Sequence, residues 1–421
     1  MDGQCGRAGD YVDKRRIEAD LTALAAIGAQ EGGGITRRAY SREDEAARAY
    51  IMAAMSQAGL AVRVDAAGNI FARRAESGAT GSPVMSGSHL DTVPRGGSLD
   101  GALGVVAALE AIRAIDDAGL NLSYPLEVVV FVDEEGARFN NIGLMGSRAV
   151  RGTLTAEEVQ SCCDHNGVTI AEAWRRWGLD PTRLSDARRD PSTIRAYVEL
   201  HIEQGAVLDT AGLPVGVVTG IATPVNLTFR LVGAADHAGA TPMTLRRDAL
   251  TGAAELILAV ERIARDELGP PTVATVGMLD IVPGASNVVP GEVTLAVDVR
   301  HVEAAELNRG IARIRQEAAA IAARRSLSVT AEEVGRIEPV DLSPMVIEAI
   351  GAACRAADTP HMYLSSGAAH DAMNVAHLAP TGMIFVPSVG GRSHCPEEAT
   401  RADDIVAGVR VLAHTLARLA T

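Results

Sequence analysis

Lysine is almost absent from this sequence. Lys14 is the single lysine, so arginine supplies nearly all of the 39 lysine and arginine residues. Chemistry that depends on a lysine amine, such as a Schiff base, a Ser–Lys dyad or a Walker-type phosphate loop, is therefore effectively excluded. The remaining basic side chains are arginine and histidine, which suit carboxylate binding and metal binding.

The sequence has few cysteines and lacks membrane-spanning segments. The five cysteines are an odd number without a CxxC spacing, which favours reduced thiols in the cytosol. No apolar run approaches the length of a bilayer span, and the N-terminal MDGQCGRAGDYVDKRRIEAD has no apolar signal-peptide core. We therefore expect a cytoplasmic protein without a membrane partner. The net charge of −14 disfavours nucleic acid as a partner, although local arginines can still bind a small anion.

The first half of the chain has the pattern of an α/β domain. With 421 residues, 47% of them hydrophobic, the chain is too long for one ordinary compact domain, and we expect two. A short apolar strand at Pro83–Ser86 is followed by a helical run at Gly101–Asp116 and a continuous apolar strand at Leu126–Val132. This alternation predicts a mostly parallel sheet with helices on both faces. Upstream, helical patterning is expected over 18–59, with a helix start at Ser41, and a hairpin over 61–73.

The pattern changes after about Gly212. Strand-like segments at 213–233 and 272–300 alternate with helical segments at 248–268 and 302–324. This order predicts a smaller α+β insertion with an antiparallel sheet, after which the α/β pattern resumes near Ile347. The predicted domains are a catalytic domain in two parts, 1–213 and 329–421, interrupted by a second domain at 214–328.

Four segments share one arrangement, in which an apolar strand leads to acidic residues or histidine. They are Gly87-Ser88-His89 through Asp100, Asp133-Glu134-Glu135, Glu199-Leu200-His201 and Ser393-His394. In open parallel sheets, sites form where the carboxyl ends of strands converge. We therefore expect these segments to meet. Each alone is weak evidence, because single histidines near strand ends and acidic triplets are usually structural or solvated.

There are more candidate metal ligands than a single catalytic zinc ion normally binds. Five side chains are available: His89, Asp100, Glu135, His201 and His394. A mixed nitrogen and oxygen set suits zinc or manganese, and a catalytic zinc usually has three protein ligands plus water. The set fits two metal ions if one carboxylate bridges them, and Asp100 is the obvious candidate.

Two further acidic residues have predicted roles beside the metals. Glu134 adjoins Glu135 at a strand end, where neighbouring side chains diverge, so Glu134 can face the attacking water as general base. Asp91 lies two residues after His89. Its carboxylate can accept the second ring proton of His89 and thereby set the tautomer.

At these residues the sequence resembles a known family. It is similar to the dinuclear metallo-amidohydrolases of the aminoacylase/carboxypeptidase (M20-type peptidase) superfamily, specifically the hydantoinase/carbamoylase branch. That branch includes N-carbamoyl-L-amino acid hydrolases, allantoate amidohydrolases and β-ureidopropionases. The matching stretches run from about residue 87 to 398: GSHLDTVPRGGSLDGALGV, VDEEGARF, ELHIEQGAVL, HAGATPMTLRRDAL, PGASNVVPGEV, VDVR, SGAAHDAM and FVPSVGGRSHCPEE.

The resemblance implies a set of roles and an assembly. It assigns two divalent metals (Zn, Mn, Co or Ni) to the five ligands above and the general-base role to Glu134. It implies that His237 polarises the scissile carbonyl, that Asn287 and Arg300 hold a substrate carboxylate, and that Gln204 and Gly367 line the pocket. It also implies that the smaller domain is a lid that forms a homodimer. Structural alternatives are a sheet-edge role for Arg300 and a turn role for Asn287.

The implied activity is hydrolysis of the ureido or amide C–N bond of a small anionic N-carbamoyl amino acid. Allantoate hydrolysis or N-acyl amino acid hydrolysis at the same site is the alternative, and a non-catalytic binding protein is a further one. Two departures from the family pattern bear on the substrate. Ala369 replaces a common glycine, and Thr223–Leu227 reads TPVNL where relatives often carry glycine and polar residues.

Overall fold

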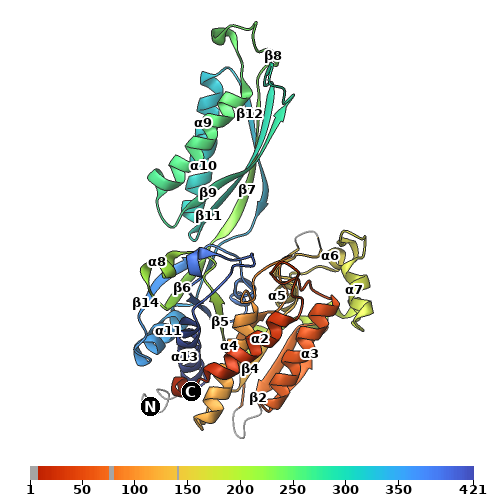
Figure 1. The fold of residues 1–421 in the computed structure, drawn as a ribbon, viewed down its shortest axis with the longest axis vertical. Coiled ribbons are helices and arrows are strands. Elements are labelled where there is room, and N and C mark those ends of the chain that lie inside the picture. The colour runs from red at the N-terminus through yellow and green to blue at the C-terminus, as the bar shows by residue number, and fades with distance from the viewer. Residues whose placement is uncertain (1–7, 75–79, 140–141) are drawn as a thin grey trace. The chain divides into compact units, whose positions relative to one another are not determined.

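The computed structural model describes residues 8–74, 80–139 and 142–421. These residues form two compact units (Figure 1). The first unit comprises 1–219, 342–364 and 370–421, and the second comprises 220–341 and 365–369. Cys5 and the start of the N-terminal segment discussed above lie outside the described residues. Within the described ranges, no helix combines the length and apolar composition needed to cross a membrane.

The first unit is built on a mixed sheet whose central strands are parallel. In the described residues the strand order is β1-β2-β4-β3-β5-β15-β6-β13, with β14 paired to β6. Strands β4, β3, β5 and β15 run parallel, and β1, β2 and β6 extend the sheet in the antiparallel sense. The strands of this sheet are β1 Leu60–Val64, β2 Ile70–Arg74, β3 Val84–His89, β4 Leu126–Phe131, β5 Ala196–Ile202, β6 Val215–Ile221, β13 Val340–Asp341, β14 His361–Ser366 and β15 Thr381–Val386. Strand β13 and the last two residues of β6 and of β14 belong to the second unit.

Helices lie along this sheet and bury its apolar face. Helix α4 packs against β3, β4 and β5, and α13 packs against α4, α11 and β15. Val128 and Val130 of β4 share one buried cluster with α4 and α13, as alternate residues of a strand should. The helices of this unit are α2 Lys14–Ala26, α3 Arg42–Gln57, α4 Ala102–Asp117, α5 Met145–Arg151, α6 Ala156–Ser161, α7 Ile170–Arg176, α8 Val207–Ala211, α11 Pro344–Ala356, α12 Ala372–Val375 and α13 Ala402–Leu419.

The second unit is a layer of helices on an antiparallel sheet. Its sheet has the order β12-β7-β11-β9, and α9 and α10 pack on one face (Figure 1). Alternate residues of β7, including Val225, Leu227 and Phe229, are buried beneath these helices. The elements are β7 Thr223–Val232, β8 Asp236–His237, α9 Ala249–Arg262, β9 Val273–Val282, β10 Val288–Val289, β11 Glu292–His301, α10 Ala304–Arg324 and β12 Ser328–Arg336, and a π-helical turn at Ile263–Leu268 extends α9.

The fold class expected from the sequence is confirmed, while one helical expectation is wrong. The segment predicted to be helical over 18–59 is two helices, α2 and α3, separated by a turn-rich stretch. Gly32, Gly33 and Gly34 in that stretch have positive φ values of 80°, 95° and 81°, which a helix does not accommodate. Ser41 begins α3 as expected, since its side chain accepts a hydrogen bond from the backbone N–H of Asp44.

The limits of the two units follow from strand pairing. Strand β6 pairs with β15 of the first unit, so residues 215–219 belong there, although the sequence placed the change at 214. Strand β12 pairs with β7, so the second unit continues beyond the predicted 328 to Asp341.

Candidate metal centre and active site

The four sequence segments meet at one edge of the first unit's sheet. His89 is the last residue of β3, and Asp133, Glu134 and Glu135 follow the end of β4. His201 lies near the end of β5, and His394 follows β15. Because these four strands are parallel neighbours, their carboxyl ends lie side by side, which is the convergence predicted from the sequence.

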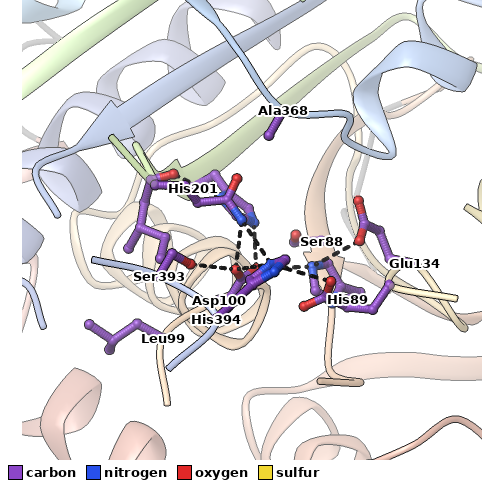
Figure 2. Close-up of polar contacts among 12 residues, drawn as sticks. Ser88, His89, Leu99, Asp100, Glu134, His201, Ala368, Ser393 and His394 are labelled. Carbon is purple, nitrogen blue, oxygen red and sulfur yellow. Dashed lines mark hydrogen bonds and ion pairs between the residues drawn. The ribbon is translucent and has the colours of Figure 1, made fainter. Parts of the chain in front are cut away.

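Asp100 lies between two groups of side chains that could each hold a metal ion. Its Oδ1 is 3.5 Å from His89 Nε2 and 3.2 Å from His201 Nε2. Its Oδ2 is 3.3 Å from His394 Nε2, and that nitrogen is 3.4 Å from Glu135 Oε2. Figure 2 shows Asp100 at the centre of these contacts. The two oxygens of one carboxylate thus face two separate sets of donors.

The two buried histidines present the same ring nitrogen to this centre. The Nδ1 of His89 is 3.1 Å from the backbone oxygen of Asp91, and the Nδ1 of His201 is 2.9 Å from the backbone oxygen of Ile202. A carbonyl can only accept, so each Nδ1 carries a proton and each Nε2 is directed at Asp100.

The expected contact between the Asp91 carboxylate and His89 is wrong in detail. The Asp91 Oδ1 is 3.7 Å from His89 Nδ1, beyond hydrogen-bond distance, and the backbone carbonyl of Asp91 takes that proton instead. The carboxylate accepts the backbone N–H groups of Glu134 and Glu135, each at 3.1 Å. Asp91 therefore orients His89 through its main chain and the two glutamates through its side chain.

Glu134 lies on the histidine side of the centre. Its Oε2 is 3.7 Å from His89 Nε2, and its side chain is 10% exposed (Figure 2). Glu135 points instead at His394, and its Oε1 is buried without a hydrogen-bond partner. The side chains of the adjacent glutamates diverge, as expected at a strand end. The Glu134 carboxylate therefore lies beside His89, and the Glu135 carboxylate lies beside His394.

The centre concentrates negative charge in a buried space. Burial raises the pKa of Glu134 well above its usual range, and burial together with the charge of Asp100 raises the pKa of Glu135 to about 7. Burial also opposes ionisation of Asp100, but the three surrounding histidines outweigh it and hold its pKa well below the usual range. The hydrogen bond to Asp100 raises the pKa of His394 to about 9.

These features fit divalent cations. Imidazole nitrogens and carboxylate oxygens are the donors that zinc and manganese accept. Donor atoms 3.2 to 3.5 Å apart match neighbouring ligands of one ion held at about 2 Å, and the buried Glu135 Oε1 has no hydrogen-bond partner in the described residues. A cation would also oppose the burial and the neighbouring carboxylate charges that raise the pKa values of Glu134 and Glu135.

Gln204 contacts this centre directly. Its Nε2 donates to Asp100 Oδ2 at 2.7 Å and lies 3.4 Å from His394 Nε2. Its backbone N–H donates to the Ser388 hydroxyl, which holds the residue in a left-handed conformation with φ 59°. The predicted pocket residue is therefore a neighbour of the candidate bridging carboxylate.

In the second unit, a two-stranded ribbon brings His237 and Asn287 together. His237 of β8 pairs with Val288 of β10, and the N–H of Ala238 donates to the backbone oxygen of Asn287 at 2.9 Å. The Nδ1 of His237 accepts two backbone N–H groups, from Gly239 at 3.0 Å and from Ala240 at 3.1 Å. The ring proton must then sit on Nε2, so the exposed imidazole presents a hydrogen-bond donor.

Arg300 and Gly367 also meet within the second unit. Arg300 lies near the end of β11, and its Nη1 donates to the Gly367 carbonyl at 2.8 Å. Its Nε and Nη2 donate to the two carboxylate oxygens of Asp298 at 2.8 and 3.0 Å. These residues line a cavity of about 420 Å³. Part of the guanidinium remains free for a further acceptor, because five N–H groups are present and three are used.

Sequence reasoning missed two buried residues beneath His201. Glu199, His201 and His370 form a third group of possible donors. However, the Glu199 carboxylate is occupied by the Ser88 hydroxyl at 2.7 Å, the Tyr197 hydroxyl at 3.1 Å and the Ala372 N–H at 3.0 Å. The His370 ring lies 4.6 Å from the His201 ring, and burial lowers its pKa well below the usual value. Both residues lie close to His201. Their positions within the motifs ELHIEQG and SGAAHDAM were the sequence feature that could have identified them.

Comparison with known proteins identifies related sequences over nearly the whole chain. Residues 85–418 match the peptidase family M20/M25/M40. An N-carbamoyl-L-amino acid amidohydrolase from Geobacillus stearothermophilus is 43% identical over 409 residues, which cover 97% of this chain and 99% of that protein. An allantoate amidohydrolase from Escherichia coli K12 is 36% identical over 97% of this chain and 98% of its own length.

The fold is also similar to that of a solved structure from the hydantoinase/carbamoylase family. An amidase of the hydantoinase/carbamoylase family from Burkholderia multivorans superposes with a TM-score of 0.90 at 38% identity, over 97% of this chain and 98% of that one.

Proposed function

The chain belongs to the peptidase family M20/M25/M40, and on this premise we propose that it is an amidohydrolase that cleaves the ureido C–N bond of small N-carbamoyl-L-amino acids. The observation that carries the proposal is Asp100, whose two oxygens face separate donor groups beside the free carboxylate of Glu134. We assign two divalent ions to these groups, held by His89, Asp100, Glu135, His201 and His394, with zinc, manganese, cobalt and nickel as the candidates.

The metals would lower the pKa of water and polarise the scissile carbonyl. Glu134 takes the proton from the attacking water and passes it to the leaving nitrogen. Asp91 holds the backbone of Glu134 and Glu135, so it fixes where the base lies.

For the second unit we propose that His237, Asn287, Arg300 and Gly367 bind the substrate. The Nε2–H of His237 donates to the oxygen that gains negative charge, and Asn287 and Arg300 hold the substrate carboxylate. A ureido substrate then yields ammonia, carbon dioxide and the free amino acid. The charge of Arg300 is already balanced by Asp298, so the substrate carboxylate is selected by hydrogen-bond geometry more than by net charge.

The test is a substrate panel for the chelator-stripped protein reconstituted with each metal. The panel contains N-carbamoyl-α-amino acids, N-carbamoyl-β-alanine, allantoate and N-acyl amino acids, and ammonia and free amino acid are measured together. Both products from N-carbamoyl-L-amino acids support the proposal. Ammonia from allantoate alone favours the alternative that the Escherichia coli relative names, and release of amino acid only from N-acyl substrates favours an amidase. Binding without turnover of any member would mean a non-catalytic protein.

We also propose that the protein is a cytoplasmic homodimer formed through the second unit. Strand β9 is an edge strand of its sheet, and it exposes Val273, Met278, Leu279 and Val282. An exposed apolar edge strand favours pairing with another strand. Sedimentation of the wild-type chain beside a Met278→Glu/Leu279→Lys variant tests this assembly, and a monomeric wild type would contradict it.

A further inference from the structure

Glu398 is a buried acidic residue with no role in the reaction described so far. It is 7% exposed, and it lies four residues after His394 in the segment that follows β15. Its carboxylate is directed toward the Asp100 segment, which is 298 residues away in sequence. Such a residue needs compensating contacts, because an unpaired buried carboxylate is costly.

One oxygen of Glu398 accepts hydrogen bonds from the backbone of the segment that contains Asp100. Oε1 accepts the backbone N–H of Leu99 at 2.9 Å and that of Asp100 at 3.0 Å. Helix α4 begins directly afterwards, and its N-cap residue Gly101 supplies no side-chain acceptor. Glu398 therefore holds the backbone turn that leads into α4 and places a negative charge near the start of that helix.

The other oxygen accepts a hydrogen bond from the segment that contains His394. Oε2 accepts the hydroxyl of Ser393 at 2.8 Å, and the same hydroxyl is 3.0 Å from Asp100 Oδ2 (Figure 2 draws the contact between Ser393 and Asp100). One hydroxyl has one proton, so Ser393 shares it between the two carboxylates. Glu398 and Ser393 thus connect the loop after β3 to the loop after β15.

We propose that Glu398 is a positioning residue that sets the bridging carboxylate of Asp100 in register with His394, and so determines how tightly the two metals bind. This inference rests on the proposed dinuclear site and extends it to a residue that touches neither metal. The glycine at position 97 also leaves room for the Glu398 side chain. A Cβ at Gly97 would lie 2.0 Å from both Cδ and Oε1 of Glu398.

The test measures metal affinity without substrate. Zn²⁺ or Mn²⁺ is titrated into the chelator-stripped full chain against a competing chromogenic chelator, for wild type, Glu398→Ala, Glu398→Gln and Glu397→Ala. Glu397 is the matched control because its side chain is 62% exposed and pairs with Arg392 instead. We expect Glu398→Ala to weaken metal binding about 10- to 100-fold, as loss of a residue that orients metal ligands usually does.

Glu398→Gln separates positioning from charge. Its amide oxygen can accept both backbone N–H groups, and its amide nitrogen can donate to Ser393, whose proton then goes to Asp100. A positioning role predicts that Gln recovers most of the lost affinity, whereas a variant as weak as Glu398→Ala overturns it. If Glu398→Ala does not fold, Ser393→Ala replaces it and should weaken binding in the same direction.

Two other results would also be decisive. Wild-type affinity in Glu398→Ala overturns this inference and leaves the proposed function intact. A wild-type chain that binds no divalent ion overturns the proposed function itself, so the two failures are distinguishable.

Discussion

Gly101 limits the room around His89, and its replacement by alanine tests the metal centre directly. Gly101 has φ 65°, and an added Cβ would lie 2.4 Å from His89 Cε1 and Nδ1. Tolerable contacts begin near 3.4 Å, so the imidazole or the helix start must move by about 1 Å. Metal–ligand distances tolerate roughly 0.2 Å. We therefore expect Gly101→Ala to weaken metal binding by at least about tenfold, a lower bound taken from losses at residues that only orient ligands.

The matched control is Gly119, just after the other end of α4. It has φ 64°, and an added Cβ meets nothing within 4 Å. Gly119→Ala therefore introduces an alanine at a similar positive φ without the collision, whereas Gly101, with ψ −50°, lies in the more strained γ-turn region. Metal content after dialysis and chelator competition are measured for both variants. Equal metal affinity in Gly101→Ala and Gly119→Ala would refute the placement of His89 as a ligand.

Four further predictions concern the second unit and the charge of the centre. His237→Ala should lower kcat about 10²- to 10³-fold at unchanged metal content, as loss of an oxyanion donor does, and an equal loss in the exposed-residue control His165→Ala would contradict this. Arg300→Ala should raise KM about 10- to 100-fold, from 1.5–3 kcal/mol for charged hydrogen bonds, with a smaller effect on kcat; an unchanged KM for a carboxylate substrate would argue against that role. Because the pKa of His394 is raised to about 9 and that of Glu135 to about 7 in the metal-free centre, metal uptake must release protons, and chelator competition should show affinity rising from roughly pH 6 to 9. The stability that His394 gains from Asp100 in the metal-free protein is fully present below about pH 6.5 and is lost as the pH rises through about 9, which urea unfolding at several pH values would detect.

The parts of the fold that were predictable are those whose signal is local. The run at Leu126–Val132, apolar except for Glu127, became the fully buried strand β4, since a strand covered on both faces shows no regular polar alternation. Ser41 was recognisable as a helix start because capping depends on residues three positions apart. The convergence of the site followed from parallel strands, whose carboxyl ends share one edge.

The remainder depended on contacts that sequence spacing does not encode. The role of Glu398 arises from neighbours almost 300 residues away, so no periodicity marks it. Spacing placed Asp91 beside His89 but could not decide between its carbonyl and its carboxylate as the acceptor. The break between α2 and α3 is an exception, because three consecutive glycines, Gly32, Gly33 and Gly34, are a local loop signal in the sequence.

The role proposed for Glu134 is that of the base in a metal-dependent hydrolase acting on N-carbamoyl amino acids. It is tested most directly by ammonia release from an N-carbamoyl-L-amino acid, with wild type and Glu134→Gln compared at matched, measured metal content. We expect the variant to bind the metals as wild type does and to lose about 10²- to 10⁴-fold in kcat. Substantial turnover by a fully metal-loaded Glu134→Gln protein would contradict it.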